Sequence, residues 1–349
     1  MGVLRTRAGG GRHSCSFCDV ISIKNLLKAW RKFSKGKRSK KEVADFELNL
    51  EENIFSLHSE LSTFQWKPRP YFAFKVCDPK LREIHKADIR DMVLYQAVHQ
   101  ALYQIFNPIF IFDSYSSREM KGTHAGVKRF EEFARKVSGN YTRSGYVLKC
   151  DIRKFFDNID HKILLDLICK KVGDRDLLNL IQKIVGSFEK EKGKGLPLGN
   201  VTSQLFSNIY LNELDQFIKH RLKARYYIRY CDDFVILADN LEFLKSCLVG
   251  IQDFFREKLL VELHPRKISL RKIISGTDFL GYVSLPHYRV LRTKTKKRVL
   301  NKLVKLKEDF DKGLVDEKYF KQAVQSYLGM LKYCNGEGIK RQIDKILGD

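Results

Sequence analysis

The sequence predicts an α+β fold in which helices back an antiparallel sheet. The first observation is the order of elements between residues 146 and 263, which is strand, helix, helix, two strands, helix, strand. The second is a pair of apolar runs within residues 226–238 that meet at two adjacent aspartates, as the strands of a hairpin do. The third is the helical spacing of apolar residues in the segments between strands. This succession is typical of an antiparallel sheet with helices packed against it.

The N-terminal part is predicted to be mostly helical. Residues 1–20 are rich in Gly and Arg and are expected to form a flexible extension. Residues 20–66 have the pattern of helices interrupted by the basic loop SKGKRSKK. The segment PRPYFAFKVCDPKLREI, residues 68–84, predicts two strands joined at an Asp-Pro turn. Apolar residues at helical spacing over 89–105 then predict a helix.

Strands and helices alternate in the C-terminal part. YVLKCDI, residues 146–152, alternates poorly between apolar and polar residues, as a strand covered on both faces does. Asp160 can cap a following helix, and a Gly-rich turn at 193–199 leads into a long helix. After the hairpin, the pattern predicts a helix over 241–255, a strand at 259–263, a strand pair within 278–292 and a basic helical tail from about residue 292.

Charge in this chain is both strong and clustered. The 349 residues are 44% hydrophobic and 12% aromatic, enough for a sizeable core in two or three subdomains. The formal net charge is +24, from 65 basic and 41 acidic residues. Residues 28–41 and 292–307 each contain eight basic residues and no acidic one. Such clusters indicate an anionic partner, nucleic acid first and a membrane surface second, with a generally basic soluble protein as the alternative.

The second basic segment has the pattern of an amphipathic helix. Its cationic residues lie at helical spacing, opposite an apolar face of Leu300, Leu303 and Val304. Such a helix can follow the phosphates of a nucleic acid, and an ordinary solvated helix face is the alternative. The nucleic-acid-binding side chains expected here are Arg292, Lys294, Lys296, Lys297, Arg298, Lys302 and Lys305.

The eight cysteines are scattered, and several fall inside apolar runs, as reduced cysteines do. Because the chain shows no secretory segment and no run long enough to span a membrane, the sequence predicts a soluble protein of the reducing cytoplasm. Cys15-x-x-Cys18, beside His13, is half of a zinc site without a recognisable second pair, so metal binding there is the less favoured interpretation.

Asp232 and Asp233 stand side by side in RYCDDFVILA, whose other residues favour a buried strand. Adjacent carboxylates repel each other and lose hydration on burial, whereas Mg²⁺ binds such oxygens and removes the penalty. Two-metal phosphoryl transfer needs carboxylates from neighbouring strands, and Asp151, at the end of YVLKCD, fits that need. Alone, either motif has a structural explanation as a turn or a helix cap. Together, in a chain of this charge, they predict a magnesium site.

YCDD, with CDIRKFFDNIDH upstream, resembles the two catalytic motifs of reverse transcriptases. The resemblance extends from about residue 24 to the C-terminus and includes, in that family's order, KLREI, GLPLGNVTSQ, HPRKISL and GTDFLGY. It implies a right-hand polymerase fold. The expected parts are a basic flexible extension at 1–23, fingers at 24–145 with 173–198 returning to the junction of fingers and palm, a palm at 146–290 and a basic helical thumb at 291–349.

The resemblance implies roles for the residues of the carboxylate motifs. Asp151 and Asp232 would ligate two Mg²⁺ ions, with Asp233 assisting and the carbonyl of Ile152 contributing. Lys267 matches the lysine that protonates the leaving pyrophosphate, a general-acid role. A surface lysine without a catalytic role is the alternative for Lys267.

Further roles concern the nucleotide and the primer. Phe156, five residues after Asp151, matches the steric gate that selects dNTPs over rNTPs, and Arg82, with Lys86, would face the triphosphate. A core aromatic and a surface ion pair are the alternatives for Phe156 and Arg82. The remaining implied contacts are Leu198, Gly199 and Gln204 for the dNTP and Phe279, Leu280 and Gly281 for the primer grip.

Two positions that differ from the usual reverse transcriptase motif make the resemblance more specific. Most reverse transcriptases have Gln where this chain has Leu198 and Pro where it has Gln204, and LGNVTSQ is similar to the version in diversity-generating retroelements. Those enzymes copy a template-repeat RNA into cDNA with errors opposite template adenines, and they work with a small basic accessory variability protein. The resemblance therefore implies template RNA, primer or cDNA, dNTPs and that accessory protein as partners, in a prokaryotic or phage-encoded setting. Met92 stands where related fingers often have Arg, which is a further difference.

Leu198 offers a physical hypothesis for copying errors. A Gln beside the nascent base pair can hydrogen-bond around the dNTP, whereas Leu can neither donate nor accept. Weaker anchoring lowers discrimination between competing transition states. A tolerated apolar substitution with ordinary fidelity is the alternative.

Three other functions stay open from the sequence. An accurate retron or group II intron-like reverse transcriptase would not need an accessory protein. An RNA-binding protein on a degenerate polymerase fold is less favoured, because all three expected carboxylates are present. An RNA-templated RNA polymerase is disfavoured by Phe156.

Overall fold

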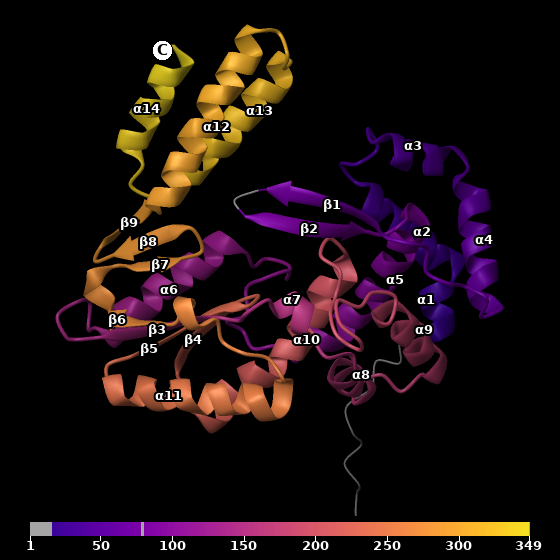
Figure 1. Cartoon of the computed structure of the whole chain (residues 1–349), viewed down its shortest axis with the longest axis horizontal. Coiled ribbons are helices and arrows are strands. Elements are labelled where there is room, and N and C mark those ends of the chain that lie inside the picture. Colours follow the sequence, from indigo (N-terminus) through magenta and orange to yellow (C-terminus); the bar gives the residue numbers. More distant parts are fainter. Residues whose placement is uncertain (1–15, 78–79, 349) are drawn as a thin grey trace, which may run out of the picture. The chain divides into compact units, whose positions relative to one another are not determined.

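Figure 1 shows a computed structural model of the chain, which describes residues 16–77 and 80–348. The chain divides into two compact units. The first comprises the described residues up to Phe110 together with Lys154–Glu213, and the second comprises Ile111–Arg153 and the C-terminal part. Each unit is therefore built from two separate stretches of chain. The helices and antiparallel sheets confirm the α+β class, while the division into fingers, palm and thumb stays a prediction.

The first unit is mostly helical and carries one hairpin. Strands β1 (Phe72–Cys77) and β2 (Leu81–Lys86) pair antiparallel, as the sequence predicts, and the Asp-Pro turn lies outside the described residues. The helices are α1 (Phe17–Ile21), α2 (Ile23–Ser34), α3 (Lys41–Leu48), α4 (Leu50–Ser62), α5 (Ile89–Phe106), α7 (Phe155–Asn158), α8 (His161–Cys169), α9 (Arg175–Val185) and most of α10 (Val201–Gln216).

Capping carboxylates begin several of these helices. Asp174 accepts a hydrogen bond from the backbone N of Leu177 at 2.9 Å and a second from that of Phe17 at 2.9 Å, so it also ties α1 to α9. Asp160 caps α8 as predicted. Cys18 is an exposed free thiol in α1, whereas Cys15 and His13 of the candidate zinc motif lie outside the described residues.

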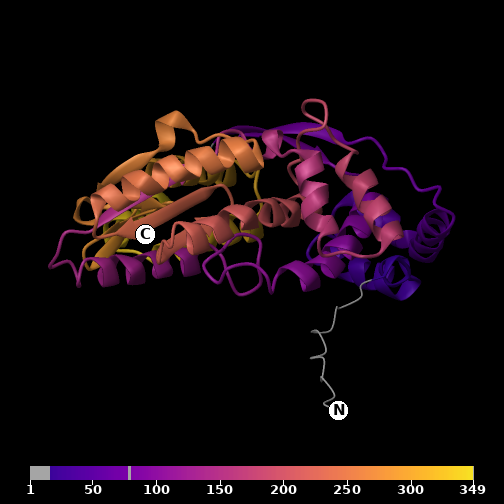
Figure 2. The same cartoon turned by 90° about the horizontal axis from the view of Figure 1, so that it is seen from below.

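A four-stranded antiparallel sheet forms the centre of the second unit. Its strands, in spatial order, are β4 (Tyr226–Tyr230), β5 (Asp233–Ala238), β3 (Tyr146–Asp151) and β6 (Ser269–Lys272). Helices α6 (Thr123–Val137) and α11 (Leu241–Phe254) contact its strands, and Figure 1 shows them on opposite faces. Figure 2, which views the molecule from below, shows α11, in orange, lying across the sheet.

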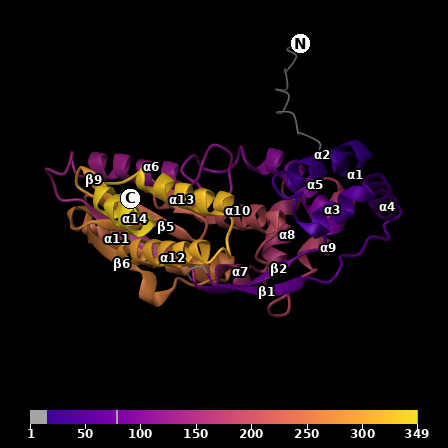
Figure 3. The same cartoon turned by 90° about the horizontal axis from the view of Figure 1, so that it is seen from above.

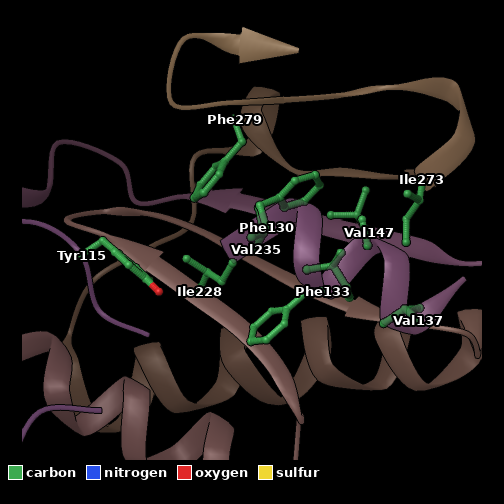
Figure 4. Packing of buried hydrophobic residues seen from close by; sticks show 11 residues of the cluster. Tyr115, Phe130, Phe133, Val137, Val147, Ile228, Val235, Ile273 and Phe279 are labelled. Carbon is green, nitrogen blue, oxygen red and sulfur yellow. The ribbon is translucent and has the colours of Figure 1, made fainter. Parts of the chain in front are cut away.

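Both faces of the sheet are packed, as the poor alternation of residues 146–152 predicts. On one face Val147, Ile228 and Val235 pack with Phe130 and Phe133 of α6 (Figure 4). The alternate residues of β3, Leu148 and Cys150, are fully buried as well. Burial on both faces leaves the strand ends as the places where polar side chains can emerge.

A second sheet and three helices complete this unit. Strands β7 (Thr277–Phe279), β8 (Tyr282–Leu285) and β9 (Tyr288–Leu291) form an antiparallel meander. Figure 3 shows the three C-terminal helices side by side, and apolar residues of all three share one core cluster. These helices are α12 (Thr293–Asp311), α13 (Glu317–Leu331) and α14 (Glu337–Leu347).

The predicted strand at 259–263 is wrong. The chain there leaves α11 through a π-helical turn, Phe255–Leu259, and Leu260 adopts a left-handed conformation (φ 50°) that ends it. Only Leu263 forms an isolated bridge, with Ile152, and β6 follows a short helical turn, Pro265–Lys267. Apolar spacing alone cannot separate a helix end from a short strand. The remaining short helical segments are Phe217–Arg221 and Ile273–Ser275.

A fully buried ion pair supports the strand that leads into the aspartates. Arg229 of β4 is 0% exposed and donates to Asp215 through Nε at 2.7 Å and through Nη2 at 2.6 Å. Its Nη1 donates to the carbonyl of Cys231 at 3.2 Å, and its Nη2 donates to Ser114 Oγ at 3.2 Å. The Tyr227 hydroxyl donates to the same carboxylate at 2.8 Å. The guanidinium therefore connects β4 directly to the turn before Asp232.

Breaking this pair should destabilise the protein. We expect Asp215→Asn to lower the free energy of unfolding by about 3–5 kcal/mol, because it leaves Arg229 as an uncompensated buried charge. Urea unfolding followed by circular dichroism measures the change. Asp253→Asn is the control, since its partner Arg256 is 74% exposed, and it should cost at most about 1 kcal/mol. Equal losses in the two variants would contradict the role of the buried pair.

Candidate metal and nucleotide site

Strand pairing brings the predicted carboxylates together. Asp151 is the last residue of β3 and pairs directly with Asp233, the first residue of β5. Asp232 precedes Asp233 in the turn between β4 and β5, and its carbonyl accepts a hydrogen bond from the backbone N of Ile152 at 3.2 Å. Residues directly opposite in an antiparallel pair have Cβ atoms about 4.5–5.5 Å apart. Two strands from distant parts of the chain thus present acidic side chains at one sheet end.

The turn that carries Asp232 is tight and strained. Tyr230 pairs with Asp233, so Cys231 and Asp232 alone join the two strands. Cys231 has φ 54°, a left-handed conformation that costs a non-glycine residue on the order of 1–3 kcal/mol. The hairpin therefore forms without the Asn-Gly or Asp-Gly signature, and the bond from Arg229 to the Cys231 carbonyl helps to hold it.

Two lysines lie against the carboxylates. Lys267 forms an ion pair with Asp151, and Lys149 Nζ lies 3.4 Å from Asp233 Oδ2. The other oxygen of Asp233, Oδ1, is buried and has no hydrogen-bond partner. Sequence reasoning singled out Lys267 but missed Lys149. The signal was its position two residues before Asp151, which puts both side chains on the same face of β3.

Burial raises the pKa values of the turn carboxylates. The pKa of Asp233 is raised to about 6, chiefly by burial and further by the charge of Asp151, while Lys149 opposes the shift. Burial, followed by the charge of Asp151, also raises the pKa of Asp232. Burial is the main reason that the pKa of the Cys231 thiol is raised to about 12. The surroundings of Asp232 and Asp233 therefore disfavour the ionised form of both carboxyl groups.

This arrangement suits a divalent cation bound by carboxylates. In residues 16–77 and 80–348, no three Asp, Glu, His or Cys side chains are already gathered as a set of metal ligands. The two lysines instead hold Asp151 and Asp233. A buried, unpartnered carboxylate oxygen and raised pKa values are nevertheless what a bound cation would correct.

Three of the predicted nucleotide contacts line one cavity within the first unit. This cavity has a volume of about 380 Å³, and Lys86, Gly199 and Gln204 lie in its wall. Gly199 has φ +113°, and a Cβ there would lie 3.0 Å from Cγ2 of Ile84, so the position requires glycine. Lys86 forms an ion pair with Glu42, another residue of the wall.

The other predicted nucleotide contacts do not line this cavity. Arg82 is exposed on β2, opposite Val76. Phe156 is half-buried, with its ring 5.6 Å from that of Phe155. Leu198 is half-buried, and its carbonyl accepts a hydrogen bond from the backbone N of His85 at 3.0 Å.

Sequence reasoning missed two buried amides in the cavity wall. Asn200 is 3% exposed, and neither polar atom of its side chain has a hydrogen-bond partner. Gln96 is 7% exposed, and its Nε2 is likewise without one. Asn200 stands directly after Gly199 in LGNVTSQ, but the letters alone give no sign of its burial.

A family model described as reverse transcriptase (RNA-dependent DNA polymerase) matches residues 78–284. The chain belongs to the reverse transcriptase family. The match covers more than half of the chain and includes Asp151, Asp232 and Asp233. Members of this family generally use divalent metal ions, usually Mg²⁺.

Individual relatives place this reverse transcriptase near intron-encoded proteins. It is 26% identical over 337 residues to "Group II intron-encoded protein LtrA" of Lactococcus lactis subsp. cremoris, covering 73% of this chain and 54% of that protein. It is 25% identical over 271 residues to "Protein YkfC" of Escherichia coli (strain K12), covering 65% of this chain and 69% of that protein. The chain thus spans about half the length of LtrA. Among the described residues, no helix combines the length and the hydropathy of a membrane span.

The predicted primer grip of this reverse transcriptase forms the turn between β7 and β8. Leu280 (φ 52°) and Gly281 (φ 90°) make the turn itself. Phe279 is only 1% exposed and packs on Phe130, with ring centroids 5.9 Å apart, so it supports the turn from the core.

The basic helix α12 is amphipathic, but its buried face differs from the predicted one. Val299 and Leu303 are buried with Thr295, whereas Val304 is 42% exposed. Helical geometry explains the shift, because residues four apart share a face and Val304 lies one position beyond it. Of the predicted nucleic-acid contacts, those exposed to solvent are Lys294, Lys297, Lys302 and Lys305, and those partly exposed are Arg292, Lys296 and Arg298. Arg292 pairs with Asp278, at 2.7 Å from Nε to Oδ1.

The raised pKa of Asp233 predicts a pH-dependent loss of stability in metal-free protein. An ordinary aspartate titrates near pH 4. Since the folded chain raises this pKa to about 6, it holds the proton more tightly, and stability falls as the pH rises through the window between these values. We expect the free energy of unfolding, relative to Asp233→Asn, to fall by up to about 3 kcal/mol between about pH 4 and pH 7.

Urea unfolding in EDTA at several pH values measures this window. Asp239→Asn, just after β5 and exposed, is the matched control for removal of one carboxylate. The difference in free energy of unfolding between wild-type protein and Asp233→Asn should change with pH, and that between wild-type protein and Asp239→Asn should not. If both differences changed with pH in the same way, Asp233 would not be the source of the effect.

Proposed function

We propose that this protein is an RNA-directed DNA polymerase that extends a primer with dNTPs by two-metal nucleotidyl transfer. The observation that carries the proposal is the strand register that sets Asp151 opposite Asp233 and beside Asp232. This acidic end of the sheet lies inside the segment that matches the reverse transcriptase family. The basic helix α12 and the net charge of +24 support a nucleic-acid substrate.

In this proposal Asp151 and Asp232 hold two Mg²⁺ ions, with Asp233 and the carbonyl of Ile152 as further ligands. The ions, when bound, supply charge stabilisation for the attacking 3′ oxygen and the leaving pyrophosphate. The unpartnered Oδ1 of Asp233 supports this assignment. Lys267, already at the Asp151 carboxylate, would donate a proton to the pyrophosphate.

Substrate selection falls to residues of the first unit in this proposal. The ring of Phe156 acts as the gate that excludes a ribose 2′ hydroxyl, and Arg82 with Lys86 faces the triphosphate. Lys86 supports this role by its place in the cavity wall beside Gly199. A guanidinium suits phosphate oxygens, and the exposed Arg82 side chain is accessible to one.

Removal of one metal ligand should abolish synthesis. We expect Asp232→Ala to reduce Mg²⁺-dependent incorporation of dNTPs on an RNA template by about 10³-fold or more, because charge stabilisation by metal ions is worth several kcal/mol. Primer extension with a labelled DNA primer measures the rate. Asp239→Ala, seven residues further along the chain and exposed just after β5, is the control and should keep its activity. Activity retained by Asp232→Ala would refute the polymerase assignment.

The more specific proposal is a polymerase of the diversity-generating type. LGNVTSQ, with Leu198 and Gln204 in place of the more common Gln and Pro, supports it. The enzyme would then copy a template-repeat RNA into cDNA with errors opposite template adenines, together with a small basic accessory protein. The exposed Gln204 lies in the cavity wall, as a nucleotide contact requires.

Restoring the usual side chain should raise fidelity. We expect Leu198→Gln to lower the error frequency opposite template adenines by about 10-fold, because a Gln can anchor the dNTP by hydrogen bonds worth about 1–1.5 kcal/mol. Sequencing of cDNA made from a defined RNA measures it. Leu48→Gln, at an 82% exposed leucine, is the control. An unchanged adenine error frequency in Leu198→Gln would remove this side chain from the explanation.

An accurate group II intron-like reverse transcriptase is the second candidate. The similarity to the group II intron-encoded protein LtrA favours it. The same cDNA sequencing separates the candidates, because errors of wild-type protein spread evenly over the four template bases would support the accurate enzyme.

A further inference from the structure

Three segments without acidic residues meet at the end of the central sheet opposite the aspartates. They are residues 134–146, 271–276 and 286–289. The backbone N of Ile273 donates to the Gly145 carbonyl at 2.9 Å, which joins the first two segments. Figure 4 shows this end of the core cluster, where Ile273 lies near Val147.

Aromatic rings from two of these segments contact each other. The rings of Tyr141 and His287 meet edge to face, with centroids 5.1 Å apart. Tyr141 is partly buried against the core cluster, whereas His287 and the next residue, Tyr288, are exposed, Tyr288 to 52%. Exposed aromatic side chains offer stacking surfaces to nucleobases.

Positive charge surrounds these rings. Arg143 and Lys272 are exposed on either side of the junction between the segments. Tyr146, the first residue of β3, pairs with Lys272. The other exposed basic side chains of the same segments are Arg135, Lys136 and Arg271.

Two carboxylates border this surface. Glu131 is paired with Arg289 at 2.6 Å, so its charge is balanced, and Asp239 is exposed after β5. The basic side chains therefore outnumber the acidic ones at this end of the sheet.

The loop that carries Tyr141 is held in an unusual conformation. Gly139, Asn140 and Tyr141 are all left-handed, with φ of 54°, 58° and 69°, and His287 has φ 68°. The hydroxyl of Ser138 accepts from the backbone N of Tyr141 at 2.9 Å, and the carbonyl of Ser138 accepts from that of Arg143 at 2.9 Å. A loop fixed in this way presents its ring without an ordering cost on binding.

We propose that this surface, formed by Tyr141, Arg143, Lys272, His287 and Tyr288 and called here the basic aromatic face, binds a single-stranded segment of RNA. The length of β3 separates it from Asp151, which places it about 17 Å from the catalytic carboxylates. Arginine and lysine side chains would bind phosphates while the exposed ring of Tyr288 stacks on a base, beside the His287 ring that Tyr141 supports. The choice of RNA over DNA rests on the proposed function.

Equilibrium binding of a labelled RNA tests the proposal. The probe is a fluorescein-labelled uridine oligomer of about 20 nucleotides, added in EDTA to full-length protein saturated with a short unlabelled RNA–DNA hybrid. We expect Arg143→Gln/Lys272→Gln to weaken binding about 5-fold or more and to make the logarithmic salt dependence shallower by about 1.4, for two lost phosphate contacts. Tyr288→Ser should weaken it about 5- to 100-fold, whereas Tyr288→Phe, which keeps the ring, should bind normally.

The control is Arg256→Gln/Lys258→Gln, which removes the same charge from exposed positions outside the face. Equal losses in this control and in Arg143→Gln/Lys272→Gln would overturn the proposal, as would normal binding by Tyr288→Ser. Binding to phosphatidylglycerol vesicles that depends on the face, with unchanged RNA binding, would assign it to membranes and also overturn the proposal.

Primer extension on a short primer–template separates this inference from the proposed polymerase. All variants of the face should extend the primer at the wild-type rate, since none of the altered residues belongs to the catalytic site. If wild-type protein bound RNA through the face but failed to extend a primer, the polymerase proposal would fail and the RNA face would stand. If primer extension were normal but RNA binding did not depend on the basic aromatic face, the RNA-binding proposal would fail and the polymerase proposal would stand.

Discussion

Antiparallel pairing of β3 with β5 sets Asp151 opposite Asp233, and the whole candidate site depends on this register. Side chains alternate between the faces of a strand, so a shift by one residue would turn the carboxylates toward the opposite face. The pairing concentrates negative charge where burial already disfavours it, as the pKa of about 6 at Asp233 indicates. Lys149 and Lys267 offset that charge in the protein alone, and a divalent cation would offset the same charge.

Strong local patterns made much of the fold predictable. The apolar runs at 146–152 and 226–238 are strands because their residues fill both faces of a covered sheet, and the basic loop between α2 and α3 lies where charges interrupt helical spacing. The predicted strand at 259–263 failed because its apolar residues end a helix that closes at a left-handed Leu260. The edge strand β6 was not predicted, because its four residues are partly buried or exposed and only one of them is apolar.

The candidate site was predictable only where its residues form an unusual pattern in the sequence. Adjacent aspartates in an apolar run are rare enough to attract notice, and Asp151 follows from the need for a second strand. The role of Lys149 depends on pairing partners, which the sequence does not display. Asp215 and Arg229 are 14 residues apart, and their bond becomes visible only when α10 and β4 are packed together. The burial of Asn200 without a hydrogen-bond partner likewise can be seen only in the structure.

The close approach of the backbone at Gly199 to Ile84 restricts which residues can occupy this part of the cavity wall. Any side chain there would collide with Ile84 and would also be forced into a conformation that L-amino acids resist. The flanking residues Leu198 and Asn200 have no positive φ, so their backbone carries no such restriction. Substitutions that reshape this wall are therefore better tolerated at the flanking positions than at the glycine between them.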